Sequence, residues 1–180
     1  LHYPLRRQRQ MCIRDRDTFH SISELPEGAK VGIVGAGLSG IELASELRES
    51  RSDLEIYLYD RGPRILRNFP EKLSKYVAKW FAKNNVTVVP NSNINKVEPG
   101  KIYNCDEPKD IDLVVWTAGI QPVEVVRNLP IDINSNGRVI VNQYHQVPTY
   151  RNVYVVGDCA DLPHAPSAQL AEVQGDQIAD

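Results

Sequence analysis

A glycine-rich turn between an apolar run and a helix-like pattern constrains this chain more than any other feature. The run over residues 30–34 leads into Gly35, and Gly37 and Gly40 follow at the spacing Gly-x-Gly-x-x-Gly. The first glycine permits a tight turn, the second lets a pyrophosphate approach the backbone, and the third lets the new helix pack against its strand. The helix would point its free N–H groups and the positive end of its dipole at the phosphates. The pattern predicts a dinucleotide site formed by Gly35, Ala36, Gly37, Leu38, Ser39 and Gly40.

An acidic residue stands where such a site needs one. Residues 54–59 form an alternating apolar pattern that predicts a second strand, and Asp60 ends it 20 residues after Gly40. A carboxylate at this place accepts hydrogen bonds from the ribose hydroxyl groups and repels a 2′-phosphate, so Asp60 favours NADH over NADPH. The opposite preference stays open, because an arginine nearby could hold a 2′-phosphate and both Arg61 and Arg64 follow. The other alternative is a glycine-rich turn without a ligand, against which the strand, helix and acid in register argue.

A further helix and strand complete the first half of the chain. The first helix is expected over residues 38–49. Residues 71–83 carry apolar side chains at i, i+3, i+4, i+7 and i+8, which predicts an amphipathic helix with its aromatic side chains in the core. Residues 86–89 form a short β-branched strand that Pro90 ends. This order of elements is typical of one half of a doubly wound, Rossmann-like α/β fold with a parallel sheet.

The chain then returns to the predicted sheet. Residues 94–98 and 101–103 flank a Pro-Gly pair, which predicts a hairpin or small β-meander. Residues 111–116 predict a buried strand of the main sheet. This strand leads into Ala118 and Gly119, and small residues at the carboxyl end of such a strand lie on the ligand side.

A second candidate nucleotide site lies near the C-terminus. Strands are expected at residues 139–142 and 152–156, and the second of them opens into Gly157 and Asp158. The glycine would permit close approach of a ligand, and the carboxylate would bind hydroxyl groups. The tail over residues 166–180 has small and apolar residues that predict a helix.

Composition limits the class of protein. The chain has 180 residues, of which 42% are hydrophobic and 24% charged, so it can bury a core of its own. No apolar run approaches the about 18–20 residues that span a bilayer, and no signal peptide is visible. The three cysteines and the histidines lack the spacing of a disulfide framework or a metal site. We therefore expect a cytoplasmic protein without a bound metal.

The first sixteen residues differ from the rest of the chain. Residues 1–16 carry five arginines without helical or strand periodicity, and they match, residue by residue, the translation of a transposon-type sequencing-library adapter. We treat this segment as a sequencing-adapter artefact; a basic arm for nucleic acid or anionic lipid is the alternative. Without it the formal net charge changes from −2 to −6, which argues against nucleic acid as a partner. The chain is then expected to be a fragment whose gene began upstream.

Four motifs occur together in one order. They are the glycine turn with Glu42, then Thr117-Ala118-Gly119, Gly157-Asp158 and Ala168-Gln169-x-Ala171. Over about residues 20–180, this combination resembles flavoproteins with two dinucleotide-binding domains. It resembles most closely type II NADH dehydrogenases, which are non-proton-pumping NADH:quinone oxidoreductases, and their bacilli-type NADH dehydrogenase-like relatives. The resemblance implies one domain that binds FAD and another, inserted in it, that binds NADH and passes hydride to the flavin.

The resemblance also implies roles for single residues. It implies that NADH is bound by the glycine turn together with Glu42, Asp60, Ala118 and Gly119, and FAD by Gly157, Asp158, Ala168 and Gln169. Glu42 matches a carboxylate near nicotinamide and flavin, which makes it the candidate catalytic residue for positioning or proton relay. The NAD(P)H-binding domain is then expected at residues 17–150, and an incomplete piece of the FAD-binding domain at 151–180.

Two departures from the family pattern bear on the partners. The family would place Gln at position 173, where this chain has Val173 followed by Gln174. If the family's glutamine contacts quinone, quinone is less secure as the acceptor. The first FAD fingerprint and the membrane-anchoring helices would lie outside this chain. The fragment alone is therefore not expected to hold FAD tightly, and peripheral association of the full-length protein with the inner face of the cell membrane stays open, as does its oligomeric state.

Two classes of function fit these motifs. The first is a fragment of a FAD-dependent NADH dehydrogenase that moves hydride from NADH to flavin and on to a small-molecule acceptor, with quinone expected; the fragment itself would be inactive. Its alternative within the class is a pyridine nucleotide-disulfide reductase with its cysteine pair upstream. The second class is a non-catalytic NADH-binding module. Gly157 and Asp158 favour the enzyme, because such a module has no use for a second dinucleotide site.

Overall fold

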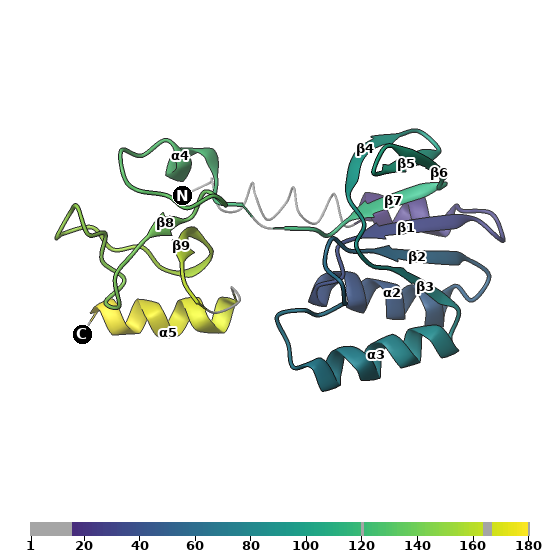
Figure 1. The fold of residues 1–180 in the computed structure, drawn as a ribbon, viewed down its shortest axis with the longest axis horizontal. Helices are drawn as coiled ribbons and strands as arrows, with labels where there is room; N and C mark the ends of the chain where they lie inside the picture. Colours follow the sequence, from purple (N-terminus) through teal and green to yellow (C-terminus); the bar gives the residue numbers. More distant parts are fainter. Residues whose placement is uncertain (1–15, 120, 164–166, 180) are drawn as a thin grey trace. The chain divides into compact units, whose positions relative to one another are not determined.

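Two compact units make up the chain, divided between Ala118 and Gly119. The computed structural model describes residues 16–119, 121–163 and 167–179 (Figure 1). Except for Arg16, the expected adapter segment lies outside the described residues. The expected limits of the two ligand-binding domains, at 17–150 and 151–180, stay a prediction.

A parallel sheet of four strands forms the centre of the first unit. The strands lie in the order β3-β2-β1-β7, with β1 at Lys30–Val34, β2 at Glu55–Tyr59, β3 at Val86–Val89 and β7 at Leu113–Trp116. Every neighbouring pair is parallel. Helix α2 (Leu38–Ser50) connects β1 to β2, and helix α3 (Glu71–Lys83) connects β2 to β3. The expected α/β fold with a Rossmann-like parallel sheet is therefore confirmed.

Alternate residues of β2 point to opposite faces of the sheet. Ile56 and Leu58 belong to a buried cluster with residues of α2 and α3, whereas Tyr57 and Tyr59 belong to a cluster on the other face. That other face carries an antiparallel meander, opposite the helices in Figure 1. Its strands are β4 (Ile94–Glu98), β5 (Lys101–Asn104) and β6 (Glu107–Asp110). The meander is confirmed, but nothing in the sequence indicated β6, because its four residues are polar or proline and all are exposed.

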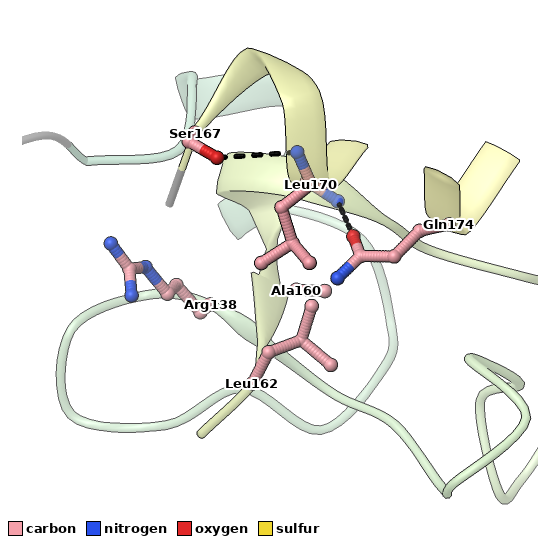
Figure 2. A pocket seen from close by; sticks show the side chains of 7 residues that line it. Arg138, Ala160, Leu162, Ser167, Leu170 and Gln174 are labelled. Carbon is pink, nitrogen blue, oxygen red and sulfur yellow. Dashed lines mark hydrogen bonds between the residues drawn. The ribbon is translucent and has the colours of Figure 1, made fainter. Parts of the chain in front are cut away.

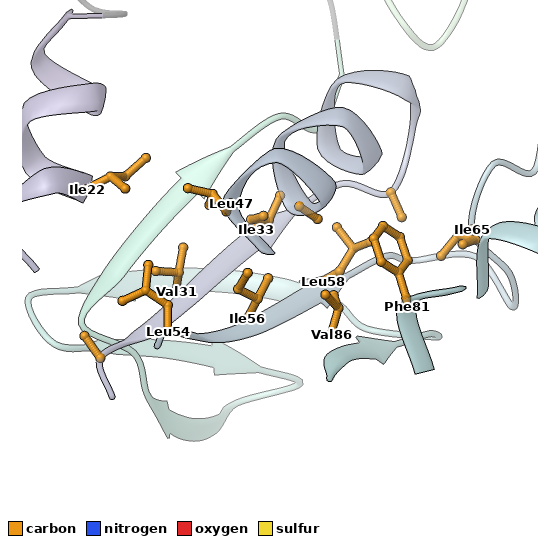
Figure 3. Packing of buried hydrophobic residues seen from close by; sticks show 13 residues of the cluster. Ile22, Val31, Ile33, Leu47, Leu54, Ile56, Leu58, Ile65, Phe81 and Val86 are labelled. Carbon is orange, nitrogen blue, oxygen red and sulfur yellow. The ribbon is translucent and has the colours of Figure 1, made fainter. Parts of the chain in front are cut away.

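The cluster on the helix side fixes the sheet that carries the glycine turn (Figure 3). Phe81 from α3, Ile33 from β1 and Leu58 from β2 are each 0% exposed. Burial of such side chains is the main free-energy gain of folding, about 1.5–3 kcal/mol for each. The position of the turn at the end of β1 therefore depends on this cluster.

The buried face of α3 is narrower than its apolar spacing indicates. Leu73 is 40% exposed and Tyr76 70% exposed, although both were expected in the core. Ser74 lies in the core instead, and its hydroxyl donates to the carbonyl oxygen of Ile65 at 2.7 Å. A polar side chain can be buried when it has such a partner, and the periodicity of apolar residues does not reveal it.

Strand β7 is less buried than expected. It stands at the end of the strand order, so one of its edges has no strand beside it among the described residues. Trp116 is 56% exposed, although residues 111–116 were expected to form a buried strand. An edge strand covers less of its side chains than a central strand, which explains the difference.

The polar segment before β1 contains a helix that its composition did not indicate. Residues 16–23 are helical, and Ile22 is buried in the helix-side cluster. Arg51 holds this segment, because its guanidinium donates to the carbonyl oxygens of Ile22 at 2.8 Å and Leu25 at 2.9 Å. The same guanidinium forms an ion pair with Asp53 at 2.7 Å, which lowers the pKa of that carboxyl.

The second unit has little regular structure around one longer helix. It contains α4 (Glu124–Arg127), β8 (Val139–Ile140), the 3₁₀ turn η1 (Gly157–Cys159), β9 (Ala160–Asp161) and α5 (Ala168–Ala179). Strands β8 and β9 pair in parallel. The helix expected in the tail is confirmed as α5.

The prediction of two strands in the second unit is mostly wrong. The strand expected at residues 139–142 is reduced to β8, and residues 152–156 form no strand. In that stretch Tyr154 makes an isolated antiparallel bridge with Gln146. The backbone N–H and C=O groups of a buried strand need hydrogen-bond partners along its whole length. Among the described residues, this stretch has only the single β-bridge to Gln146.

Two kinds of feature are absent from the described residues. None of the helices in the described ranges combines the length and the apolar character needed to cross a bilayer. Across the same ranges, no three His, Cys, Asp or Glu side chains come together as a group able to hold a metal ion.

Candidate functional site

The turn between β1 and α2 tolerates only glycine at two positions. Gly35 has a φ of +109°, and a Cβ atom on it would lie 2.8 Å from the backbone N and Cα of Ala118. A Cβ atom on Gly40 would lie 1.8 Å from the carbonyl oxygen of Gly35 and 2.9 Å from the hydroxyl of Thr117. Both glycines are therefore required by the protein's own packing, with or without a ligand.

Gly37 is different, because nothing in the fold itself requires it. A Cβ atom on Gly37 would meet no atom within 4 Å, and the backbone there is extended, with φ −78° and ψ −169°. Gly37 is the N-cap of α2 and makes no side-chain capping bond, so the first-turn N–H groups remain for another partner. Leu38 and Ser39 beside it are exposed. This open backbone fits a group that approaches closely and carries negative charge.

Asp60 is bound directly to the glycine turn. Its carboxylate oxygen Oδ2 accepts the N–H of Ala36 at 2.8 Å, and Oδ1 accepts the N–H of Gly62 at 2.7 Å. Each carboxylate oxygen has two lone-pair sites, so each keeps one for a further donor. The carboxylate is thus held at the end of β2, next to the turn, and can still accept hydrogen bonds from hydroxyl groups.

The two arginines after Asp60 lie in different environments. The guanidinium of Arg64 donates to three carbonyl oxygens of its own loop, those of Leu66 at 3.1 Å, Arg67 at 2.8 Å and Phe69 at 3.1 Å. Arg61 is exposed. Of the two arginines that could hold a 2′-phosphate, Arg64 is therefore engaged within the protein.

The residues that follow β7 pack against the glycine turn. Thr117 donates its hydroxyl to the carbonyl oxygens of Gly35 at 2.9 Å and Val34 at 3.1 Å. Ala118 lies against Gly35, as the clash of an added Cβ shows. The indole N–H of Trp116 donates to the carbonyl oxygen of Ala118 at 3.0 Å. The sequence did not reveal this contact of the Thr117 hydroxyl with the glycine turn, because the partners are more than 80 residues apart.

The structure brings together most of the residues expected at the first site. Gly35, Gly40, Asp60 and Ala118 surround one turn within the first unit. Glu42 lies on α2, one helical turn after Leu38 and exposed like it. Gly119, with φ +82°, belongs to the second unit and is exposed.

Of the residues expected at the second site, Gly157 contacts helix α5, and Ala168 and Gln169 are the first residues of that helix. Gly157 has a φ of +65°, and its N–H donates to the side-chain oxygen of Gln174 on α5 at 2.9 Å. Asp158, Ala168 and Gln169 are exposed. At the start of α5, the hydroxyl of Ser167 accepts the N–H of Leu170 at 3.2 Å, a capping bond drawn in Figure 2.

Gln174 is the residue here that sequence reasoning missed. The family pattern places its glutamine at position 173, but Val173 is 53% exposed, whereas Gln174 is 4% exposed. A buried glutamine with a backbone partner leaves no local signal in sequence. Gln174 also lines a small pocket whose other lining residues include Arg138, Ala160, Leu162, Ser167 and Leu170 (Figure 2).

The chain is similar in sequence to a group of related oxidoreductases. A family model described as pyridine nucleotide-disulphide oxidoreductase matches residues 8–175. The NADH dehydrogenase-like protein YutJ of Bacillus subtilis is 56% identical over 169 residues, which cover 94% of this chain and 48% of that protein. A type II NADH:quinone oxidoreductase of Haemophilus influenzae is 29% identical over 73% of this chain and 33% of that protein. The chain spans less than half the length of these relatives.

Solved structures share the fold. A water-forming NADH oxidase from Lactobacillus brevis bound to NADH has a TM-score of 0.71 at 18% identity, over 91% of this chain and 38% of that one. A sulfide:quinone oxidoreductase from Aquifex aeolicus has a TM-score of 0.72 at 18% identity, over 91% of this chain and 44% of that one. At these identities the likeness concerns the fold alone.

Proposed function

The chain belongs to the pyridine nucleotide-disulphide oxidoreductase family, and we propose that it is part of a FAD-dependent NADH dehydrogenase that reduces quinone. Membership in this family implies the use of FAD and NADH. We propose that the activity belongs to a longer protein of which this chain is a fragment, and the chain's coverage of 48% of the Bacillus relative supports this. A relative named as a NADH:quinone oxidoreductase supports quinone as the acceptor. Because quinones dissolve in lipid, we place the full protein peripherally on the inner face of the cell membrane.

One observation carries the proposal: the open glycine turn with Asp60 bound to it. The turn offers uncapped N–H groups at the start of α2 and no side chain over Gly37. Asp60 keeps lone pairs for hydroxyl groups while it accepts the N–H of Ala36. A diphosphate beside the helix start and a ribose beside the carboxylate match these two features in chemistry. The residues present therefore fit NADH.

Each residue of the first site has a separate task. When bound, NADH supplies the hydride and FAD accepts it. The backbone from Gly35 to Gly40 binds the diphosphate, and Asp60 binds the adenosine ribose. Ala118 and Gly119 lie on the nicotinamide side. Glu42 carries an exposed carboxylate on α2, and its task is to position the reacting groups or to take up and release a proton.

The second site is assigned to FAD. Asp158 presents an exposed carboxylate for the ribityl hydroxyl groups, directly after the positive-φ turn at Gly157. Ala168 and Gln169 are exposed at the start of α5, where they can border the flavin ring. All three side chains are exposed, and the polar groups of a carboxylate and an amide suit the cofactor's polyol chain.

The preference for NADH can be tested at Asp60. Asp60→Asn removes the negative charge and leaves one side-chain oxygen, so we expect NADH to bind about tenfold more weakly. NADPH should lose less, because the repulsion of its 2′-phosphate disappears, and the preference for NADH should narrow. Titration calorimetry of both nucleotides measures this, with Asp110→Asn on the exposed strand β6 as the matched control. An unchanged ratio of the two affinities would refute the role of Asp60.

The proposed activity is tested on the complete gene product that carries this chain. The purified protein should contain FAD, oxidise NADH and reduce a short-chain quinone. Activity with a disulfide acceptor but not with quinone would instead identify a disulfide reductase. NADH binding without FAD would identify a nucleotide-binding module and refute the proposal.

A further inference from the structure

A single buried side chain connects the two segments assigned to FAD. Gln174 lies in the middle of α5, is 4% exposed, and its side-chain oxygen accepts the N–H of Gly157 at 2.9 Å. Figure 2 shows this bond as a dashed line from the amide of Gln174, which lies among Ala160, Leu162 and Leu170. The contact joins residues 17 positions apart, so tertiary packing rather than local turn geometry forms it.

The turn at Gly157 depends on α5 in two ways. Ala171, three residues before Gln174 and so on the same side of the helix, would lie 3.1 Å from a Cβ atom added to Gly157. Gln174 supplies the acceptor for the Gly157 N–H, and a partly buried backbone N–H without a partner would destabilise the fold. One face of α5 therefore restricts the position of Gly157 through the packing of Ala171 and the hydrogen bond to Gln174.

We propose that Gln174 is a positioning residue for FAD: it fixes the Gly157–Asp158 turn against α5, and so sets the spacing between Asp158 and the Ala168–Gln169 segment. The inference rests on the proposed function. Because the Gly157 N–H is bound inside the protein, the polar groups of the turn that remain for the ligand are those of Asp158, which is exposed. The start of the same helix carries Ala168 and Gln169. The two segments assigned to FAD are therefore connected through helix α5.

If Gln174 only stabilised the fold, its replacement would weaken FAD and NADH binding alike. Two variants of Gln174 separate this structural role from a role in positioning the FAD site. Gln174→Met keeps an unbranched side chain of similar length but removes the acceptor. Gln174→Glu keeps an acceptor for the Gly157 N–H and should rescue binding in part. Gln177→Met is the matched control on the same helix, because Gln177 is exposed and contacts the ring of His145 at 3.2 Å.

The experiment measures FAD and NADH affinity on the complete gene product. We expect Gln174→Met to raise the dissociation constant for FAD about tenfold, Gln174→Glu to lie between it and wild type, and Gln177→Met to match wild type. NADH affinity should not change, since neither Gln174 nor Gly157, to which it binds, belongs to the proposed NADH site. Unchanged FAD binding in Gln174→Met, or an equal loss of NADH affinity, would overturn the inference. A wild-type protein that binds no FAD would refute the proposed function, and this inference with it.

A measurement on the wild-type chain covers the case in which Gln174→Met does not fold. Hydrogen exchange followed by NMR reports each backbone N–H separately. The Gly157 N–H should exchange slowly and that of the exposed Asp158 quickly. Equal, fast exchange at both positions would show that the bond to Gln174 is not kept in solution and would overturn the inference.

Discussion

The variant Gly40→Ala is expected to lose the folded first unit. Its new Cβ atom would lie 1.8 Å from the carbonyl oxygen of Gly35, and backbone atoms cannot move away as a flexible side chain does. The same Cβ atom would also lie 2.9 Å from the hydroxyl of Thr117. Relief of both contacts requires α2 to move away from β1, so we expect a loss of more than about 3 kcal/mol in the free energy of unfolding.

Tryptophan fluorescence during urea unfolding measures this loss. The chain has two tryptophans, Trp80 and Trp116, and both lie in the first unit, so the signal reports on that unit alone. Gly175→Ala is the matched control: it lies in helix α5 with open space around it, and alanine is the better helix former. A Gly40→Ala variant as stable as wild type would contradict the close packing of α2 on β1.

Replacing Phe81 with alanine should cause the second large loss. Phe81 is 0% exposed and belongs to the cluster that joins α3 to the sheet. Its truncation removes a buried ring and leaves a cavity, which costs about 3–5 kcal/mol. The midpoint of urea unfolding should fall with little change in the slope.

An exposed aromatic residue on the same helix provides the control. Tyr76 is 70% exposed, so Tyr76→Ala should change the free energy of unfolding by no more than about 0.5 kcal/mol. Equal losses in the two variants would mean that the face of α3 toward the sheet is assigned wrongly. Sequence periodicity alone put both residues in the core, so this pair also tests the narrower buried face.

Local patterns were sufficient to predict the geometry of the glycine turn and the place of Asp60 beside it. The spacing of Gly35, Gly37 and Gly40 predicted the turn because steric requirements act between near neighbours and one returning strand. Asp60 was predictable because the end of β2 must lie beside the end of β1 in a parallel sheet, and the bond from Ala36 agrees with this. Helices α2 and α3 were predicted within a residue of their observed bounds, whereas the helix over residues 16–23 was not predicted.

Contacts between distant residues were not predictable from the same patterns. The hydroxyl of Thr117 and the amide of Gln174 each bind a backbone group far away in the chain, and neither contact changes a local period. The stretch 152–156 has the composition of a strand, but strand formation also requires partners, and Tyr154 finds only Gln146. Exposure of Trp116 likewise depends on its place at the edge of the sheet.

The most direct test of the account compares NADH binding by the wild-type chain and by Gly37→Ala. A Cβ atom on Gly37 meets no protein atom within 4 Å, so the variant should stay folded and lose no more than about 1 kcal/mol, the typical cost of alanine at an N-cap. It would occupy the space where the diphosphate approaches, and we predict NADH affinity at least about tenfold weaker. Saturable binding by wild type with this selective loss is the expected result. No binding by wild type, or equal binding by both proteins, would contradict a dinucleotide site at this turn.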